Sequence, residues 1–262
     1  MKAGFLMTKK TAFDRVLAAR AQDKITIKDL IAGLTDDFIE LHGDRAYGDD
    51  AAVYGGIGLL QQQPATLIGI RKADDEKSAT DVHFGSAEPD GYRKALRLMK
   101  QAEKFQRPVI TFINTPGAFP DVNAEYHGQG YLISQLILQG LQLKTPYLAI
   151  IVGEGGSGGA LALAVGDCVW AFQDSIYSVL SPEGYATILW KDSSRVREAA
   201  EIMKLTPPEL VEQGIIDKII PEVRTKAEIN QLKQQLFDKI KELSAIPTAE
   251  LLRRRFARYR KF

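Results

Sequence analysis

Apolar positions along the chain follow two spacings in turn, and this alternation predicts strands that are connected by helices. Two runs with β-type alternation, Val53–Leu60 and Ala65–Arg71, are separated by Gln61–Pro64, a segment typical of a hairpin. A second pair of strands is predicted at Cys168–Phe172 and Ile176–Leu180. A plain series of strand–helix–strand units would have one strand, and not two, between successive helices. The pattern therefore favours an α/β fold with mostly parallel pairing and doubled strands at two places.

Helical spacing fills the segments between these strands. Apolar residues recur from Leu30 to Leu41, and the pattern predicts one helix that begins at Thr26 and ends at Gly43. Further strands are predicted at Val109–Asn114, Tyr147–Val152 and Ile215–Ile220, and helices at Gly91–Gln106, Ala124–Leu143, Ala160–Val165, Pro182–Trp190, Ser194–Leu205, Lys226–Leu243 and Thr248–Tyr259. No fixed repeat or low-complexity linker divides the chain, so one domain is expected.

Composition excludes several classes of function. The 262 residues carry 34 Lys and Arg against 33 Asp and Glu, a balance that argues against a general nucleic-acid binder. No apolar stretch approaches the roughly 20 residues of a membrane span, and Met1–Met7 lacks the apolar run of a signal peptide. The single cysteine, Cys168, excludes an internal disulfide framework and a multi-cysteine metal site. We therefore expect a soluble, cytoplasmic protein.

The most informative segment is Gly153–Gly159, in which five of the seven residues are glycine. It follows the predicted strand Tyr147–Val152 and precedes the helical run Ala160–Val165. A turn of this kind directs unpaired backbone N–H groups toward one place. A group that is anionic, or that becomes anionic during a reaction, is expected there.

Two enzyme motifs match the glycines by spacing. Gly153, Gly155 and Gly158 form G-x-G-x-x-G, and Asp174 lies about 20 residues downstream, as in dinucleotide-binding folds. Gly155, Ser157 and Gly159 form the G-x-S-x-G of α/β-hydrolases. That hydrolase chemistry needs a histidine after the serine, whereas the three histidines of this chain all precede Ser157: His42, His83 and His127.

Two other enzyme interpretations concern the same turn. A P-loop is excluded because no Lys-Ser or Lys-Thr follows the glycines. Alternatively, the backbone N–H groups of Gly158 and Gly159 form an oxyanion hole, which stabilises a developing negative charge without a side-chain nucleophile. The simplest alternative is a turn in which a helix and a strand merely pack closely, although five glycines exceed what such a turn requires.

A second loop, Asn114–Pro120, follows the neighbouring predicted strand. Pro116 and Pro120 fix the backbone on both sides of Gly117–Phe119 and stiffen it. The loop is either an ordinary strand-to-helix connection or the second wall of a site beside the glycines.

At these loops the chain resembles the α-subunit family of bacterial acetyl-CoA carboxylase carboxyltransferases. Segments that carry the resemblance run in order from about residue 35 to Pro221: Leu41–Asp50, Gly91–Met99, Thr115–Pro120, Gly153–Leu163, Tyr177–Gly184 and Ile188–Lys191. The chain departs from the family pattern at Arg71–Phe84, where a basic, glycine-containing loop is expected, and at Asp121, Asn123, Tyr126 and His127.

The resemblance implies a crotonase-like spiral of stacked ββα units with helical extensions at both ends. It places the carboxyltransferase domain at residues 1–246 and a basic C-terminal helix at residues 247–262. It also implies that the glycines face a thioester or biotin, not a dinucleotide. The basic residues of the last helix are expected to be solvated or to face a partner: Arg253, Arg254, Arg255, Arg258, Arg260 and Lys261.

The implied reaction transfers the carboxyl group of carboxybiotin, held on biotin carboxyl carrier protein, to acetyl-CoA and yields malonyl-CoA for fatty acid synthesis. The resemblance implies no covalently bound cofactor, an α2β2 heterotetramer with a β subunit that alone carries zinc, and a wider complex with biotin carboxylase, to which ATP binding belongs. A catalytically weak paralogue that acts as a scaffold is the alternative.

The resemblance also assigns roles to individual residues. The backbone N–H groups of Gly158 and Gly159 are expected to form the oxyanion hole. Gly155 and Gly156 are expected to shape the turn, and Gly117, Ala118 and Phe119 to face it across the site. Ser157 is then a small turn residue and not a nucleophile.

Overall fold

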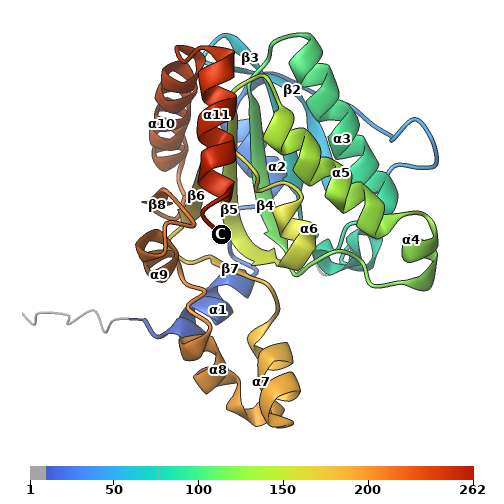
Figure 1. The fold of residues 1–262 in the computed structure, drawn as a ribbon, viewed down its shortest axis with the longest axis vertical. Helices are drawn as coiled ribbons and strands as arrows, with labels where there is room; N and C mark the ends of the chain where they lie inside the picture. The colour runs from blue at the N-terminus through green and yellow to red at the C-terminus, as the bar shows by residue number, and fades with distance from the viewer. Residues whose placement is uncertain (1–9, 76) are drawn as a thin grey trace, which may run out of the picture.

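The computed structural model describes residues 10–75 and 77–262, so Met1–Met7, where no signal-peptide run was expected, lies outside the described residues. A single mixed sheet runs through the described part of the chain in the order β1-β2-β3-β4-β5-β6-β8, and β7 pairs with β5 (Figure 1). The strands are β1 (Asp36–Glu40), β2 (Val53–Leu60), β3 (Gln63–Ile70), β4 (Val109–Thr115), β5 (Tyr147–Gly156), β6 (Cys168–Phe172), β7 (Ile176–Ser178) and β8 (Lys218–Ile220).

Strands β1, β2 and β3 pair antiparallel, and every later pairing is parallel. The helices are α1 (Ala12–Arg20), α2 (Ile27–Leu34), α3 (Pro89–Lys104), α4 (Val122–Tyr126), α5 (Gln129–Gln142), α6 (Ser157–Leu161), α7 (Pro182–Trp190), α8 (Val196–Ile202), α9 (Pro207–Glu212), α10 (Lys226–Ser244) and α11 (Thr248–Tyr259). The predicted α/β class with mostly parallel pairing is confirmed, as is the hairpin of β2 and β3. The two further predicted strands also form, as β6 and the shorter β7, but each pairs with β5 and they do not pair with each other.

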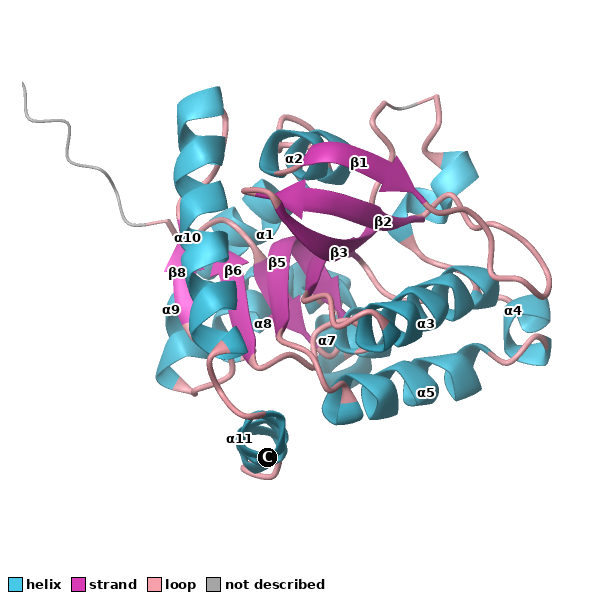
Figure 2. Cartoon of the chain, turned by 90° about the horizontal axis from the view of Figure 1, so that it is seen from above, coloured by secondary structure: helices cyan, strands magenta, loops and turns pink. Residues whose placement is uncertain are grey.

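Helices cover both faces of the sheet (Figure 2). On one face, buried residues of α3 and α5 such as Met99 and Leu136 form one core. On the other face, α2 and α10 contribute Leu30 and Leu236 to a second core. A third, smaller cluster joins α1 to α8, and the α7–α8 pair projects from the body of the molecule (Figure 1).

The helix predicted from Thr26 to Gly43 is wrong in its second half. Helix α2 ends at Leu34, and Asp36–Glu40 forms strand β1 at the edge of the sheet. Tertiary contacts override the helical spacing here: Glu40 pairs with Gly56, and the Phe38 ring packs on Tyr54 at 5.3 Å. A Cβ at Gly56 would lie 2.0 Å from the Ile39 carbonyl oxygen, so the close approach of β1 needs that glycine.

Other boundaries differ from the predicted ones for local reasons. The helix predicted at Ala124–Leu143 is split into α4 and α5 at Gly128, which adopts a φ of +89°. Strand β5 continues to Gly156, so α6 begins at Ser157, earlier than the predicted Ala160. Helix α9, which was not predicted, begins at Pro207 behind a capping box of Thr206 and Glu209.

The last helix has the predicted bounds, but two of its basic residues, Arg255 and Arg258, are not solvated. Arg255 is 1% exposed and donates hydrogen bonds to both carboxylate oxygens of Asp167, at 2.7 and 2.8 Å. Its guanidinium also binds the carbonyls of Gly140, Leu143 and Thr145. The expectation of a solvated or partner-facing helix is therefore wrong for Arg255, which anchors α11 to the body. It is also wrong for Arg258, which donates to Asp217 at 2.6 Å and to the Ile215 carbonyl at 2.7 Å. In the described part of the chain, no helix is long and apolar enough to cross a membrane.

Candidate functional site

Three loops meet at the carboxyl edge of the parallel strands. They follow β3, β4 and β5, whose parallel pairing brings their ends to the same side of the sheet. The third segment is Gly153–Gly159, the end of β5 together with the start of α6, which the sequence predicted as a turn and which is called the glycine turn below. The chain turns at Ser157, an exposed residue with a φ of +56°, and continues directly into α6.

The glycine turn contacts the loop after β4, and these contacts explain two of the glycines. A Cβ at Gly156 would lie 2.0 Å from the Pro116 carbonyl oxygen, and one at Gly159 would lie 2.5 Å from the Ala118 nitrogen. Gly117, with a φ of +148°, is held by the Thr115 hydroxyl, which accepts from its N–H at 3.1 Å. The structure thus brings together the turn and the facing loop, as the sequence predicted.

Gly158 and Gly159 lie in the first turn of α6. The N–H groups of a first helical turn have no partner within the helix, and no side chain of the described residues caps this one. A Cβ at Gly158 would meet only Ile133 Cγ2, at 3.6 Å, so this side of the turn has space. The turn therefore offers backbone donors next to space for a ligand.

The loop after β3 forms a third wall, which the sequence did not predict as part of a site. His83 and Phe84 both have positive φ, +45° and +55°, and Gly85 follows with +93°. The His83 ring stacks on Phe119 of the facing loop, with ring centroids 4.0 Å apart. Two successive non-glycine residues in this conformation store strain, which is typical of ligand-binding segments. The sequence signal was the departure from the family pattern between Arg71 and Phe84.

A buried carboxylate lies within the glycine run. Glu154 is 7% exposed and accepts hydrogen bonds from Arg20 Nε at 2.7 Å and from Lys72 Nζ at 2.5 Å. Burial acts to raise the pKa of Glu154, but the Lys72 and Arg20 cations outweigh it and hold that pKa below its ordinary value. Glu154 is therefore an ionised anchor and not a proton-transfer group.

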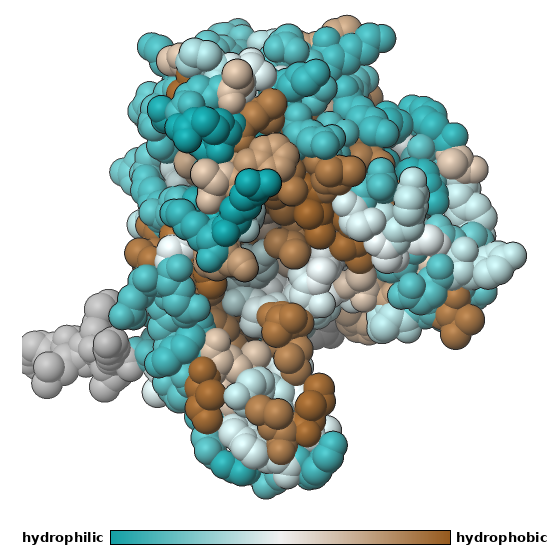
Figure 3. All heavy atoms as spheres, viewed as in Figure 1, coloured by the Kyte–Doolittle hydropathy of each residue, from teal (hydrophilic) through white to brown (hydrophobic). Residues whose placement is uncertain are grey.

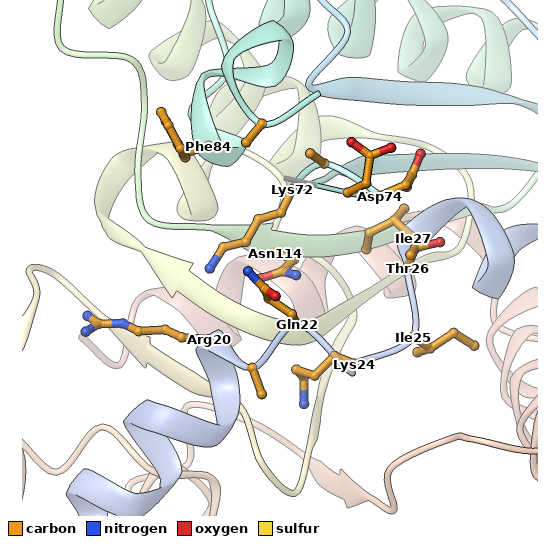
Figure 4. A pocket seen from close by; sticks show the side chains of 14 residues that line it. Arg20, Gln22, Lys24, Ile25, Thr26, Ile27, Lys72, Asp74, Phe84 and Asn114 are labelled. Carbon is orange, nitrogen blue, oxygen red and sulfur yellow. The ribbon is translucent and has the colours of Figure 1, made fainter. Parts of the chain in front are cut away.

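A pocket of about 650 Å³ opens beside this anchor, in the size range of small-molecule sites (Figure 4). Its lining joins the end of α1, the start of α2 and the loop after β3. The labelled side chains include Arg20, Lys72, Phe84 and Asn114. Gly158 and Gly159 do not line this pocket, but Arg20 and Lys72, which bind Glu154 of the glycine run, do.

Tyr92 is a further residue of the site that the sequence analysis missed. It is 0% exposed, and its hydroxyl lies 2.6 Å from the position of a Cβ at Gly159. Among the described residues this hydroxyl has no hydrogen-bond partner. Burial raises the pKa of Tyr92, so the phenol stays neutral beneath the turn. In the sequence, Tyr92 lies within the predicted helix Gly91–Gln106 and the matching segment Gly91–Met99, neither of which assigns it a role.

The other motif-based interpretations fail in the structure. The three histidines have other partners: His42 pairs with Asp49, His83 stacks on Phe119, and His127 packs against Tyr47. A base for Ser157 is thus missing among the described residues. Asp174, the residue that would bind a ribose in a dinucleotide fold, pairs with Lys10 at 2.6 Å. Gly153 and Gly155 lie within strand β5, whereas the first glycines of a dinucleotide-binding motif lie in the turn after its strand, so the dinucleotide alternative is wrong.

Solved structures to which this chain is similar include a transcarboxylase and a malonate decarboxylase. The chain superposes on transcarboxylase 12S, with methylmalonyl-coenzyme A and methylmalonic acid bound, at a TM-score of 0.71 and 17% identity; the match covers 86% of this chain and 43% of that one. A Pseudomonas malonate decarboxylase hetero-tetramer in complex with coenzyme A matches at a TM-score of 0.66 and 14% identity, over 80% and 86% of the two chains. The fold class is thus the crotonase-type carboxyltransferase fold, as predicted.

Sequence comparison defines the family more closely. The family model described as acetyl co-enzyme A carboxylase carboxyltransferase-like matches residues 5–262. A carboxyl transferase subunit alpha of acetyl-coenzyme A carboxylase from Streptococcus thermophilus is 54% identical over 246 residues, 93% of this chain and 96% of its own length. The Streptococcus pneumoniae protein of the same name is 53% identical over 94% and 98%. The chain belongs to this acetyl-CoA carboxylase carboxyltransferase family, which confirms the predicted resemblance.

Proposed function

We propose that this chain is the α subunit of an acetyl-CoA carboxylase carboxyltransferase, which moves the carboxyl group of carboxybiotin to acetyl-CoA and yields malonyl-CoA. Family membership over residues 5–262 supports this proposal. The observation that carries it at the site is the contact between the glycine turn and the Gly117–Phe119 loop, with open space beside Gly158 and, among the described residues, no side-chain cap on the first turn of α6.

The chemistry suits a site made of backbone donors. Negative charge develops on the ureido oxygen as the carboxyl group leaves biotin, and on the acetyl group as it becomes an enolate. We assign Gly158 and Gly159 to the biotin side, where each donor contributes about 2.7–4 kcal/mol in the transition state. Gly155 and Gly156 shape the turn, while Gly117, Ala118 and Phe119 face it. The biotin anion itself can take the acetyl proton, so no protein base is required.

The reaction needs a second oxyanion hole, and this chain offers one glycine turn of that kind. We therefore infer a β subunit that supplies the other hole, in an α2β2 heterotetramer. Biotin carboxyl carrier protein is the biotin donor, and biotin carboxylase belongs to the wider complex. Zinc is expected only in the β subunit and ATP binding only in the wider complex. A cytoplasmic location stays a prediction.

An exposed apolar surface supports the need for a partner. The projecting α7 and the segment before it expose Val179, Ile188 and Leu189, by 75%, 62% and 57%. Figure 3 shows apolar residues gathered on this projecting part. Exposed apolar side chains in one region are typical of protein–protein contacts. We expect the β subunit to cover this surface.

The proposal is tested by measuring malonyl-CoA formation with the purified chain alone, with the β subunit alone and with both. We expect activity only in the mixture, because each subunit holds one hole and water must be excluded from both charges. If the chain alone matched the rate of the mixture, the shared site would be wrong. A complex that assembles but transfers no carboxyl group would support the scaffold alternative.

A further inference from the structure

Strand β5 contains an irregularity immediately before the glycine turn. Ile113 of β4 pairs with Ile151 of β5, but the next paired residues are Thr115 and Gly155. One residue of β4 therefore faces three residues of β5, Val152 to Glu154. On its other side, β5 pairs with β6 up to Ile151 and with β7 from Glu154 onward. Such bulges redirect a strand, and they are common next to active sites.

The residue that faces this bulge is Asn114. Its side-chain carbonyl oxygen accepts the backbone N–H of Glu154 at 3.1 Å and so replaces the missing ladder bond. The fit is close, because a Cβ at Gly153 would lie 2.4 Å from that oxygen and 2.9 Å from the Ala19 carbonyl. Only glycine at position 153 allows Asn114 and the end of α1 to approach the bulge together.

Glu154 is held at three atoms. Its N–H binds Asn114, and its two carboxylate oxygens bind Arg20 and Lys72. Arg20 also donates two hydrogen bonds to the carboxylate of Glu183 in α7, at 2.7 and 3.2 Å. Gly158 follows only four residues after this fixed point. The position of Glu154 therefore determines where the donors of the turn lie.

We propose that Asn114 is a positioning residue that sets the direction of the glycine turn by closing the bulge with its side-chain carbonyl. The inference rests on the proposed function. Backbone donors act when they lie about 2.7–3.1 Å from the developing charge, and a displacement of about 1 Å costs roughly 100-fold in rate. Because the donors favour the transition state over the bound substrate, loss of Asn114 lowers kcat and leaves KM nearly unchanged.

The test uses the assembled α–β complex with four variants of this chain. Asn114→Ala and the similar-sized Asn114→Leu remove the acceptor, and we expect each to lower kcat by about 10- to 100-fold with KM within about threefold. Asn114→Asp keeps an oxygen acceptor and should retain kcat within about fivefold. Asn230→Ala, at an exposed site on α10, is the matched control and should leave kcat and KM unchanged.

Hydrogen–deuterium exchange of the amide of Glu154 gives a second readout that needs no activity. We expect this amide to exchange about tenfold faster or more in Asn114→Ala, and near the wild-type rate in Asn114→Asp. Normal kcat in both acceptor-free variants, or equal damage by Asp and Ala, would overturn the proposal. If the wild-type complex transfers no carboxyl group, the proposed function fails, and the exchange rates still decide whether Asn114 closes the bulge.

Discussion

The two ends of strand β5 differ in how side chains bind them. At its amino end, the N–H of Tyr147 donates to Asp167 at 2.8 Å, and Asp167 forms a buried ion pair with Arg255. At its carboxyl end, the strand leads into α6, whose first turn has no side-chain cap among the described residues, and Arg20 and Lys72 bind the Glu154 carboxylate. At the amino end, buried side chains fill the hydrogen bonds of the backbone, whereas beside the carboxyl end there is space for a ligand.

This contrast separates stability from function along a single strand. Both side chains of the Arg255–Asp167 pair are almost fully buried, 0% and 4% exposed, and the guanidinium has five hydrogen bonds. A buried pair of this kind gives little net stability in itself, but removing one partner leaves a buried charge uncompensated. Changes at the amino end should therefore affect folding, and changes at the carboxyl end should affect catalysis first.

The largest effect is expected from Arg255→Ala. The variant leaves Asp167 and three carbonyls without their donor, and we expect the free energy of unfolding to fall by about 3–5 kcal/mol. Urea denaturation measures this free energy of unfolding. Arg254→Ala, whose side chain is 60% exposed and, within the described residues, bound to Glu250 alone, is the matched control and should unfold almost like the wild type. Equal stability of the two variants would contradict the proposal that the Arg255–Asp167 pair is needed for a stable fold.

At the carboxyl end, Gly156→Ala should affect activity strongly. Its new methyl group would lie 2.0 Å from the Pro116 carbonyl, so the turn and the facing loop must separate. We expect carboxyl transfer to fall by about 100-fold, with a smaller loss of stability of about 1–3 kcal/mol. Gly130→Ala, where no atom lies within 4 Å of the new methyl, is the control and should retain activity. Normal transfer by Gly156→Ala would show that the two loops need not touch.

The carboxyl edge also contains a buried acid with a displaced pKa. Desolvation raises the pKa of Asp50 to about 6, although it accepts from the N–H groups of Ala52 and Glu88. The folded protein thus holds a proton that the unfolded chain has lost, and stability should fall as pH rises from about 4 to 6, by on the order of 2 kcal/mol. Asp50→Asn should abolish this slope in pH-dependent denaturation. An unchanged slope would show that another titratable group causes this pH dependence of stability.

The smallest effect is expected from Ser157→Gly. Ser157 already adopts a φ of +56°, which glycine tolerates better, and its hydroxyl has no histidine partner among the described residues. Carboxyl transfer should stay within about threefold of the wild type, because the backbone N–H groups remain. A thousandfold loss with an intact fold would restore the serine as a nucleophile.

The sequence predicted the features that depend on local pattern. The glycine run, the proline-bounded loop and the helix Thr248–Tyr259 are visible as spacing or composition. The strand Asp36–Glu40 was missed because its pairing with β2, and not its own periodicity, decides its conformation. Arg255 looked like one more basic surface residue, since nothing in its neighbourhood along the chain indicates the distant Asp167.

In the candidate site, too, the sequence predicted local features but not contacts between distant residues. Gly158, Gly159 and the Gly117–Phe119 loop were predicted together, because the resemblance and the turn chemistry agreed on them. The roles of Asn114, Tyr92 and the strained His83–Phe84 segment depend on contacts between residues far apart in the chain. No one-dimensional pattern contains those contacts. The meeting of the two loops was therefore predictable, whereas the contacts that support them were not; the roles of Gly158 and Gly159 stay a prediction.

The most direct test of the central claim is kcat for carboxyl transfer by the Gly158→Val variant in complex with the β subunit. The Cβ itself fits, since its nearest neighbour would be Ile133 Cγ2 at 3.6 Å, so the fold should survive and circular dichroism should match the wild type. The two further methyl groups would crowd the space beside the backbone donors. We predict a loss of kcat of about 100- to 1,000-fold, with Gly158→Ala much less affected. Near-normal turnover by Gly158→Val would contradict the account and place the oxyanion site elsewhere.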